Sequence, residues 1–593
     1  MKPSNKLSLI HLSETLSIVF QSSHKWTLIS ALITIVRGCI PLLLLYVVKE
    51  LIDVVSSHIN GAESDLNKLY FTVALTAFFF LINAISGSVS SLVRERQSHY
   101  INDFVQDIIH KKTINIPYKY FEDANYQNTF YRALGDSSFR PARVFNSLLI
   151  IAQNSLTLLL ILLVLSSAHW AMIPILIVSG IPIFYFRIIY TRKIYNYRKQ
   201  HTEDERRVHY FNRLLTGKDF AKELRIFNLG DSFKEEYEFF KHDLRDKQWS
   251  LSKSKTKSEI LVQLFATVVL LLIIAFVMNK AINGEITAGA MAMYFLALQR
   301  AYSVLQGLLG SLSSLYEDNL FLKNFFAFKN IDVKNEKTNA HFPKSIRSGI
   351  KISNLSFKYT NSKSWVLKNI NLDIPRGKTI ALVGNNGCGK TTLVKLLSGL
   401  YQPTSGQITI DNYNLHDISQ NELANNISVI FQDFMLYNVN AQDNICYGNV
   451  RREKNLTSTQ GAAQKAGINE LFTNLPNGYN TTLGTLFKGS QMLSQGEWQR
   501  TALARSFYNT EAQVIILDEP TSSLDAFTES KLIAHFKEIT KDKTAIIVSH
   551  RLSTIKLADI IVVMKDKSIV EVGSPQELLD KKGVYYDMIN SLK

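Results

Sequence analysis

The residues best suited to chemistry lie in the C-terminal part of the chain, in the stretch GNNGCGKTT. Four of them match the pattern G-x-x-x-x-G-K-[ST], between a short apolar strand and a predicted helix. Backbone N–H groups of such a loop can surround phosphate, and the helix N-terminus adds positive potential. Lys390 then offers a charge to the β- and γ-phosphates, and the Thr391 hydroxyl suits Mg²⁺. The predicted phosphate loop consists of Gly384, Asn385, Asn386, Gly387, Cys388, Gly389, Lys390, Thr391 and Thr392.

A second motif, AQVIILDEPTSSLD, follows later in the chain. Residues 514–517 read as a buried strand, so Asp518 emerges at the carboxyl end of that strand, where open α/β sheets bind ligands. Asp518 suits a direct or water-mediated Mg²⁺ contact, and Glu519 is suited to polarise an attacking water. An Asp-Glu pair alone is weak evidence, but after a phosphate loop it indicates nucleotide hydrolysis.

The elements before this region have a different character. Apolar stretches long enough to cross a membrane recur up to about residue 312, and none of that length occurs after about residue 340. Six stretches are predicted to span the membrane: 27–48, 69–93, 145–166, 168–190, 259–279 and 287–312. The third and fourth must form a tight hairpin, because only SSAHW separates them.

The distribution of charge gives these spans an orientation. The formal net charge is +16, and Lys and Arg concentrate in the polar stretches 94–143 and 187–258, whereas the alternate loops carry few. This is the positive-inside pattern for six spans with both termini in the cytoplasm, so no nucleic-acid partner is expected. The three cysteines, Cys39, Cys388 and Cys446, form no CxxC motif and argue against a disulfide scaffold.

Together these motifs resemble the ATP-binding-cassette (ABC) transporters, specifically exporters with membrane and cassette domains fused in one chain. The resemblance implies an α-helical six-span membrane domain followed by an α/β P-loop ABC ATPase domain. The domains expected are an amphipathic N-terminal segment at 1–26, a membrane domain at 27–329, a linker at 330–349 and the ATPase at 350–593. Segments 120–134 and 217–230 fall where such exporters place coupling helices; read without the resemblance, each is a solvated helix-turn-helix.

The resemblance also assigns site residues that spacing alone leaves open. It places an adenine-stacking aromatic at Tyr359, a Mg²⁺- and water-sensing glutamine at Gln432, an aspartate that couples the two sites at Asp525 and a γ-phosphate histidine at His550. With Glu519 as the catalytic base, it implies ATP and Mg²⁺ as cofactors. The expected metal contacts come from Thr391, Gln432 and Asp518.

The stretch LSQGEWQR resembles the cassette signature, which in this family completes the ATP site of the other cassette. Ser494 and Gly496 would supply a hydroxyl and backbone N–H groups at a helix start. Gln495 stands where the first of two glycines is usual, and we expect its side chain to point away from phosphate. One cassette per chain implies a dimer, with a second copy preferred and a related half-transporter as the alternative.

The substrate is the least determined expectation. The segments YFEDANYQNTFYRAL and AKELRIFNLG resemble bacterial lantibiotic and bacteriocin exporters, so we expect a peptide moved out across a bacterial inner membrane. Lipid or multidrug export, an ATP-gated regulator and a membrane-anchored soluble-type ATPase are the alternatives. Arg37 and Arg300 lie inside apolar stretches and are candidates for substrate contact, with structural pairing as the alternative.

Overall fold

The computed structural model describes residues 10–59, 66–137, 139–331, 340–360 and 362–591. Two compact units make up the chain. The first comprises residues 1–116 and 124–332, and the second comprises residues 117–123 and 333–593. The start of the expected N-terminal segment and the middle of the expected linker lie outside the described residues.

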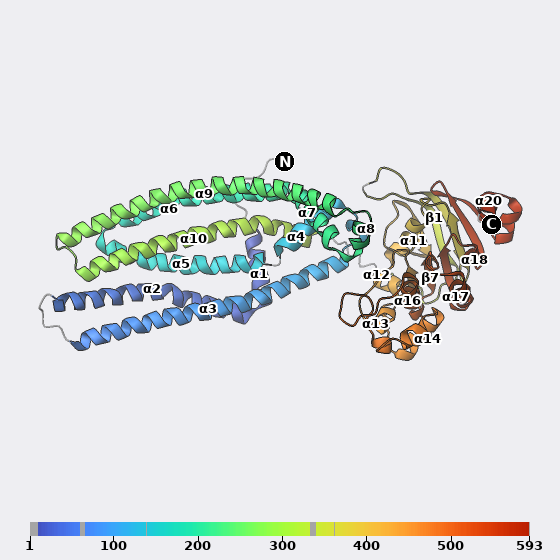
Figure 1. Cartoon of the computed structure of the whole chain (residues 1–593), viewed down its shortest axis with the longest axis horizontal. Coiled ribbons are helices and arrows are strands. Elements are labelled where there is room, and N and C mark those ends of the chain that lie inside the picture. Colours follow the sequence, from blue (N-terminus) through green and yellow to red (C-terminus); the bar gives the residue numbers. More distant parts are fainter. Residues whose placement is uncertain (1–9, 60–65, 138, 332–339, 361, 592–593) are drawn as a thin grey trace. The chain divides into compact units, whose positions relative to one another are not determined.

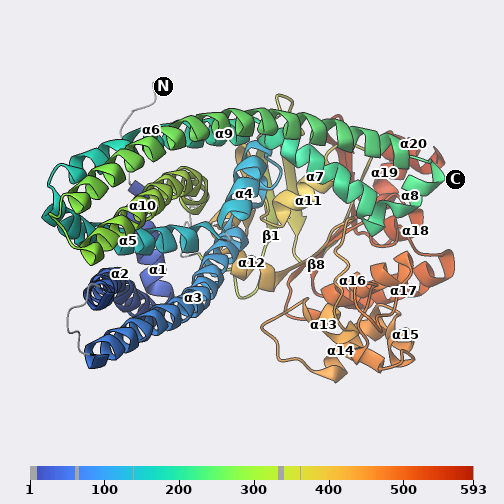
Figure 2. The same cartoon turned by 60° about the vertical axis from the view of Figure 1, so that its left-hand side comes forward.

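The first unit is built from long helices (Figures 1 and 2). Pairs α2–α3 and α6–α9 run side by side, and α10 packs on α5 (Figures 1 and 2). The helices are α1 (Ile10–Ser22), α2 (His24–Ile59), α3 (Leu66–Asn115), α4 (Ala124–Ser137), α5 (Arg140–Ala168), α6 (Met172–Gln200), α7 (Thr202–Thr216), α8 (Ala221–Ile226), α9 (Gly230–Ile282) and α10 (Ala288–Lys329).

Five of the described helices, α2, α3, α5, α6 and α9, are long and apolar enough to cross a membrane. The sixth predicted span lies within α10, a continuous helix that does not meet the same apolarity requirement. Its sequence mixes apolar residues with Gln299, Arg300 and Gln306, which lowers the mean hydropathy of the predicted span. The six-span prediction is therefore supported at five positions.

The helices extend well beyond the apolar stretches from which the spans were predicted. The fifth predicted span starts at residue 259, whereas α9 starts at Gly230. The expected hairpin is present, because α5 ends at Ala168 and α6 begins at Met172. The apolar core of this unit gathers around α10, where Ala297, Leu298 and Ala301 are fully buried.

A buried ion cluster joins α5 to α10 in this unit. Arg140 is 1% exposed and its Nη1 lies 2.7 Å from Oδ1 of Asp318, which is 0% exposed. Arg143 binds the same carboxylate, with its Nε 2.8 Å from Oδ2. The guanidinium of Arg140 also lies 3.8 Å from the ring centre of Phe321. The buried charges therefore have close partners of opposite sign.

Both segments expected to be coupling helices contain short helices. Residues Tyr118–Tyr120 form a 3-10 turn (η1) ahead of α4, and Lys218–Phe220 form another (η2) ahead of α8. Residues 117–123, between α3 and α4, belong to the second compact unit. There Lys395 Nζ lies 3.4 Å from Oε1 of Glu122, and the rings of Tyr118 and Tyr401 meet edge to face at 5.7 Å.

The second unit contains two sheets. One is antiparallel, in the order β2 (Leu367–Pro375), β1 (Gly349–Phe357), β4 (Ser405–Ile410) and β5 (Tyr413–Asn414). The other has the order β10 (Ser568–Gly573), β9 (Ile560–Lys565), β3 (Thr379–Gly384), β8 (Thr544–Val548), β7 (Val514–Asp518) and β6 (Ile427–Ile430). Strands β9, β3, β8, β7 and β6 are parallel neighbours, and β10 returns antiparallel to β9.

The parallel strands are nearly continuous apolar runs because helices and the other sheet cover their faces. Strands β3, β7 and β8 are buried at every position. The helices of this unit are α11 (Lys390–Leu397), α12 (Gln420–Asn426), α13 (Ala441–Cys446), α14 (Leu456–Lys465), α15 (Asn469–Thr473), α16 (Gln495–Tyr508), α17 (Ala526–Ile539), α18 (Leu552–Ile555), α19 (Pro575–Lys581) and α20 (Val584–Ser591).

Candidate nucleotide-binding site

The residues predicted to bind phosphate and to catalyse hydrolysis lie at one edge of the parallel sheet. Strands β3, β7, β8 and β6 all end there, because parallel strands share the direction in which they finish. The phosphate loop follows β3, Asp518 ends β7, and His550 and Gln432 follow β8 and β6. Residues far apart in the sequence are thereby brought together.

Two positions of the loop 384–389 have a backbone and surroundings that favour glycine. Gly384 has φ +151° and Gly389 has φ +109°, in the region that side chains rarely enter. A Cβ on Gly384 would lie 2.2 Å from the carbonyl oxygen of Met564, and one on Gly389 would lie 2.5 Å from a methyl of Leu367. The glycines of the motif are therefore required by both conformation and space.

Lys390 is held in this loop by backbone carbonyls. Its Nζ donates to the oxygens of Gly384 at 2.6 Å and Asn385 at 3.1 Å. The side chain is 7% exposed, so its charge is directed into the loop and not into solvent. A cation held at the start of α11 fits an anionic phosphate chain.

Glu519 lies at the centre of the candidate catalytic group. Gln432 donates from Nε2 to one carboxylate oxygen at 3.0 Å, and His550 Nε2 lies 3.5 Å from the other. The residue has φ +49°, an uncommon value for a side-chain-bearing residue, and its N–H donates to Val548 O at 2.9 Å. Burial, followed by the charge of Lys390, lowers the pKa of His550, so its ring is neutral at neutral pH.

Asp518 has the features expected of a residue that meets a cation. Burial, the largest influence, raises the pKa of its carboxyl to about 6, while the Thr391 hydroxyl and the Lys390 charge act in the opposite direction. One oxygen, Oδ2, is buried and has no hydrogen-bond partner among the described residues. A hard divalent cation prefers carboxylate and hydroxyl oxygens, so Asp518 and Thr391 fit Mg²⁺.

Tyr359 packs beside the start of α11. Its hydroxyl lies 3.1 Å from Oγ1 of Thr392, and its ring meets those of Phe357 and Tyr401 edge to face. The aromatic side chain therefore lies next to the phosphate loop, where the adenine contact was expected.

The remaining predicted residues form a second group, at the starts of α16 and α17. Ser494 caps α16 in a reciprocal pair with Glu497, since its N–H donates to Glu497 Oε2 at 2.7 Å. Asp525 caps α17 through the N–H groups of Phe527 and Thr528. Across the described chain, no hydrogen bond joins this group to residues 384–392.

Gln495 and Gly496, two positions of the signature, differ in how closely they are packed. Gln495 is exposed, and within the described ranges its side chain makes no hydrogen bond. Gly496 is close-packed, because a Cβ there would lie 3.0 Å from the carbonyl oxygen of Ser523. The expected glycine is thus retained where space demands it and replaced where the side chain reaches solvent.

Gln499 connects the two groups and was not predicted. It is 2% exposed, and its Nε2 donates to the Glu519 carbonyl at 3.0 Å and to Ser522 Oγ at 3.1 Å. Its Oε1 accepts from the Ser523 N–H at 2.9 Å. A glutamine on the buried face of a helix needs such partners, and that pattern was the signal available in the sequence.

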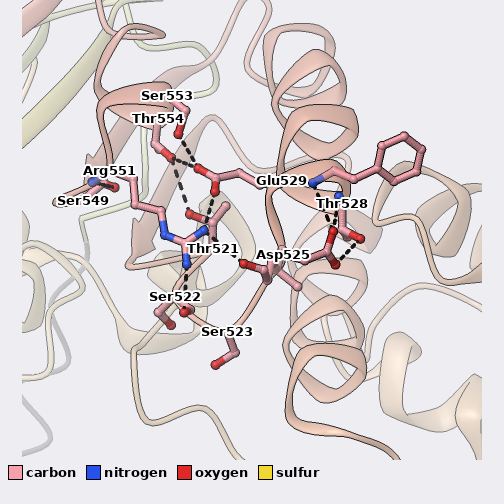
Figure 3. Close-up of polar contacts among 12 residues, drawn as sticks. Thr521, Ser522, Ser523, Asp525, Thr528, Glu529, Ser549, Arg551, Ser553 and Thr554 are labelled. Carbon is pink, nitrogen blue, oxygen red and sulfur yellow. Dashed lines mark hydrogen bonds and ion pairs between the residues drawn. The ribbon is translucent and has the colours of Figure 1, made fainter. Parts of the chain in front are cut away.

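Arg551, next to His550, was also missed. Its guanidinium donates to the carbonyls of Leu524 at 3.1 Å and Ser522 at 3.0 Å, and it pairs with Glu529. Figure 3 shows Glu529 reaching Arg551, Ser553 and Thr554 from one side while Asp525 caps its own helix. The loop 521–525 is therefore tied to the residue that follows His550.

The two arginines suggested for substrate contact lie in different environments of the first unit. Arg37 on α2 is half-buried, and its Nε has no hydrogen-bond partner among the described residues. Arg300 on α10 is exposed. The cysteines Cys39, Cys388 and Cys446 are all free.

Comparison with known families assigns both parts of the chain. The family model described as "ABC transporter transmembrane region" matches residues 27–302, and that described as "ABC transporter" matches residues 367–522.

Similar proteins cover nearly the whole chain. The subtilin transport ATP-binding protein SpaT of Bacillus subtilis is 28% identical over 98% of this chain and 93% of its own length. The nisin transport ATP-binding protein NisT of Lactococcus lactis subsp. lactis is 26% identical over 98% and 96%. An ATP-dependent lipid A-core flippase of Wigglesworthia glossinidia brevipalpis is 27% identical over 94% of each chain.

The same fold is known from a solved structure. A bacterial Atm1-family ABC exporter with ATP bound superposes with a TM-score of 0.79 at 20% identity, over 95% of this chain and 98% of the other. With one family model on each part and end-to-end similarity to these transporters, the chain belongs to the ABC transporters, as an exporter-type half-transporter whose ATPase is coupled to transport.

Proposed function

We propose that the chain exports a peptide from the cytoplasm, as one half of a homodimer in the bacterial inner membrane. The observation that carries this proposal is the similarity to the transporters of the lantibiotics subtilin and nisin, which extends over 98% of the chain. We infer ATP-driven transport from the family membership, and a peptide as the class of cargo from these two relatives.

The proposed roles follow from the geometry of the sheet edge. The loop N–H groups and Lys390 bind the triphosphate, and Tyr359 stacks on adenine. Mg²⁺, held by Thr391 and Asp518 with Gln432 nearby, would neutralise charge on the phosphates. Glu519 orients water and accepts its proton, while Gln432 and His550 hold the carboxylate on either side.

We propose six spans, with α10 as the sixth. Its apolar face packs at the centre of the first unit, so its polar residues are compatible with an interior helix lining a cavity. The concentration of Lys and Arg in residues 94–143 and 187–258 supports the orientation with both termini in the cytoplasm.

Segments 120–134 and 217–230 are the proposed coupling elements. Residues 117–123 lead into the first of them and already pack within the second unit, through Glu122 and Tyr118. A groove in that unit, lined in part by Phe431, Phe434 and Tyr437 on either side of Gln432 in the sequence, suits a second such element. Closure of two ATPase units would then shift the membrane helices between two states.

A lipid flippase is the second candidate, because the lipid A-core flippase aligns over 94% of the chain. A purely regulatory, ATP-gated role is less favoured, since Glu519 and His550 are both present and adjacent. The two export activities differ in what accumulates and where, so one preparation can separate them.

The test uses the full chain in inside-out vesicles. We expect ATP-dependent accumulation of a dye-labelled amphipathic peptide in the vesicle lumen, absent in the Glu519→Gln variant and without ATP. In parallel, movement of a labelled phospholipid between leaflets is followed by quencher accessibility. Lipid movement without peptide uptake would replace the proposal by a flippase. The absence of both activities would contradict both peptide export and lipid export.

A further inference from the structure

Two arginines in the first unit lack a counterion. Arg37 on α2 and Arg94 on α3 are both partly buried, and Arg37 Nε and one terminal nitrogen of Arg94 are enclosed without any hydrogen-bond partner. Within the part of the chain that the structure describes, neither side chain forms a salt bridge or hydrogen bond. Two positive charges are therefore left uncompensated.

Arg37 reaches from α2 to α3, the helix that carries Arg94. These helices run side by side (Figures 1 and 2), and a terminal nitrogen of Arg37 lies 3.9 Å from where a Cβ would stand on Gly87 of α3. Gly87 and Arg94 are two turns apart on α3, so they share a face of that helix. Arg94 therefore lies on the side of α3 that Arg37 reaches.

A neighbouring polar side chain on α3 does have partners on α2. Gln97, one turn from Arg94, donates from Nε2 to Thr27 Oγ1 at 3.0 Å and accepts from Ser30 Oγ at 2.7 Å. Elsewhere in the unit, the buried Arg140 has the carboxylate of Asp318 as its partner. Arg37 and Arg94 thus differ from Arg140, whose buried charge has a carboxylate partner.

Unpaired cations in a membrane helix are costly, and two near each other repel in addition. A ligand with negative charge removes both penalties when it binds. The planar guanidinium matches a carboxylate with two parallel hydrogen bonds, and Gly87 leaves space beside Arg37 that a side chain would fill.

We infer that Arg37 and Arg94 form a binding site for the carboxylate groups of an acidic cargo peptide. This inference rests on the proposed function and names the chemistry by which the cargo is recognised. The site lies between α2 and α3 of the first unit.

The test measures binding without nucleotide, on the full chain in phosphatidylcholine nanodiscs. Two synthetic amphipathic peptides serve as probes, identical except that Asp and Glu in one are Asn and Gln in the other. We expect the wild-type protein to bind the acidic peptide about tenfold more tightly. The double variant Arg37→Gln, Arg94→Gln should bind both peptides equally.

The matched control is Arg96→Gln, two residues along the same helix. Arg96 is exposed and its Nη2 contacts the Tyr100 hydroxyl at 3.2 Å, so its loss should leave the preference unchanged. Arg37→Lys with Arg94→Lys keeps the charge and should retain part of the preference. Because the glutamine variants remove uncompensated charge, their melting temperature should not fall, whereas a structural role would lower it.

Several outcomes would overturn the site. These are an acidic preference that survives in the double variant, equal binding of both peptides by the wild type, or binding of neither. Arginine-dependent binding of phosphatidylglycerol without discrimination between the peptides would assign the site to a lipid phosphate instead.

Uptake into inside-out vesicles is scored separately, so that the two proposals fail differently. Arginine-dependent preference in binding without ATP-driven uptake would refute peptide export and leave the anion site standing. Uptake of both peptides at equal rates, unaffected by the glutamine variants, would refute the anion site and leave export standing.

Discussion

At the scale of single residues, Glu519 stands out for its backbone. A φ of +49° for a residue with a side chain costs about 1–3 kcal/mol and persists only where the surroundings enforce it. Here the Glu519 N–H donates to Val548 O, and its carbonyl accepts from Gln499 at 3.0 Å. These two bonds fix the residue so that its carboxylate points between Gln432 and His550.

The first prediction follows from that arrangement. Glu519→Gln keeps the size and the backbone contacts of the side chain but removes the proton acceptor. Steady-state ATP hydrolysis should fall by about a hundredfold or more, the range expected for a general base. ATP affinity, measured with a fluorescent analogue, should stay within about twofold of the wild type, because the base is not needed for binding.

Glu511 provides the control for this substitution. It is exposed and lies just before β7, so Glu511→Gln should leave hydrolysis unchanged. Undiminished phosphate release by Glu519→Gln would show that another group activates the water.

Gln495 carries the second prediction at this scale. Its side chain is exposed at the start of α16, and Ser494 with Glu497 already satisfies the cap. Gln495→Gly should therefore change the ATPase rate by no more than about twofold, as for an exposed substitution. A large gain in the rate of phosphate release would show instead that the natural residue handicaps the signature.

At the scale of elements, the loop 521–525 is held by hydrogen bonds from two other elements. Gln499 of α16 holds it from one side, and Arg551, directly after His550, holds it from the other. Asp525 lies at the end of this loop and caps α17. The position of Asp525 therefore depends on α16, through Gln499, and on the segment after β8, through Arg551.

This tie gives the third prediction. Arg551→Gln removes two hydrogen bonds to loop carbonyls and the pair with Glu529, without touching the phosphate loop. We expect kcat for ATP hydrolysis to fall by about tenfold while KM for ATP stays within about twofold, the pattern of a positioning residue. Arg551→Lys should recover part of kcat.

A matched control separates this role from simple loss of stability. Lys531 lies on α17 with its ammonium 4.3 Å from the ring centre of Phe527, and it makes no contact with the loop carbonyls. Lys531→Gln should leave both constants unchanged. Equal loss of kcat and of thermal stability in Arg551→Gln and Arg551→Lys would reduce Arg551 to a structural residue.

Elements with strong local patterns could be predicted from the sequence. The apolar strand before the glycine loop, Asp518 at the end of β7 and the hairpin between α5 and α6 all follow from short stretches of residues. The starts of the long helices could not, because hydropathy stops where the apolar residues stop, whereas α9 continues as a polar helix from Gly230.

Contacts between distant residues were equally out of reach. Arg551 meets Glu529 and Gln499 meets Ser522 only after the sheet and its helices have assembled. The pairing of Arg140 with Asp318, and the lack of an acidic partner for Arg37 among the described residues, depend in the same way on how α2, α3, α5 and α10 pack. Sequence motifs predict the candidate catalytic residues, whereas the residues that position them become apparent only from the packing of the fold.

At the scale of the whole molecule, the residues proposed for the ATP site form two separate groups within one chain. The phosphate loop with Asp518 and Glu519 forms one group, and Ser494 with Asp525 forms the other at two helix starts. From the resemblance to the family, we expect each ATP to lie between the first group of one copy and the second group of its partner. A homodimer would then contain two composite sites, as two-fold symmetry requires.

Mixing two inactive variants tests that expectation. Lys390→Ala disables the phosphate loop and Ser494→Arg blocks the signature, so homodimers of either variant have no intact site. A mixed dimer contains one site with both defects and one site with none. Random pairing makes half of the dimers mixed, so co-expression should restore roughly a quarter of the wild-type ATPase rate. If each chain completed its own site, co-expression would restore nothing, and the signature would belong to the ATP of its own chain.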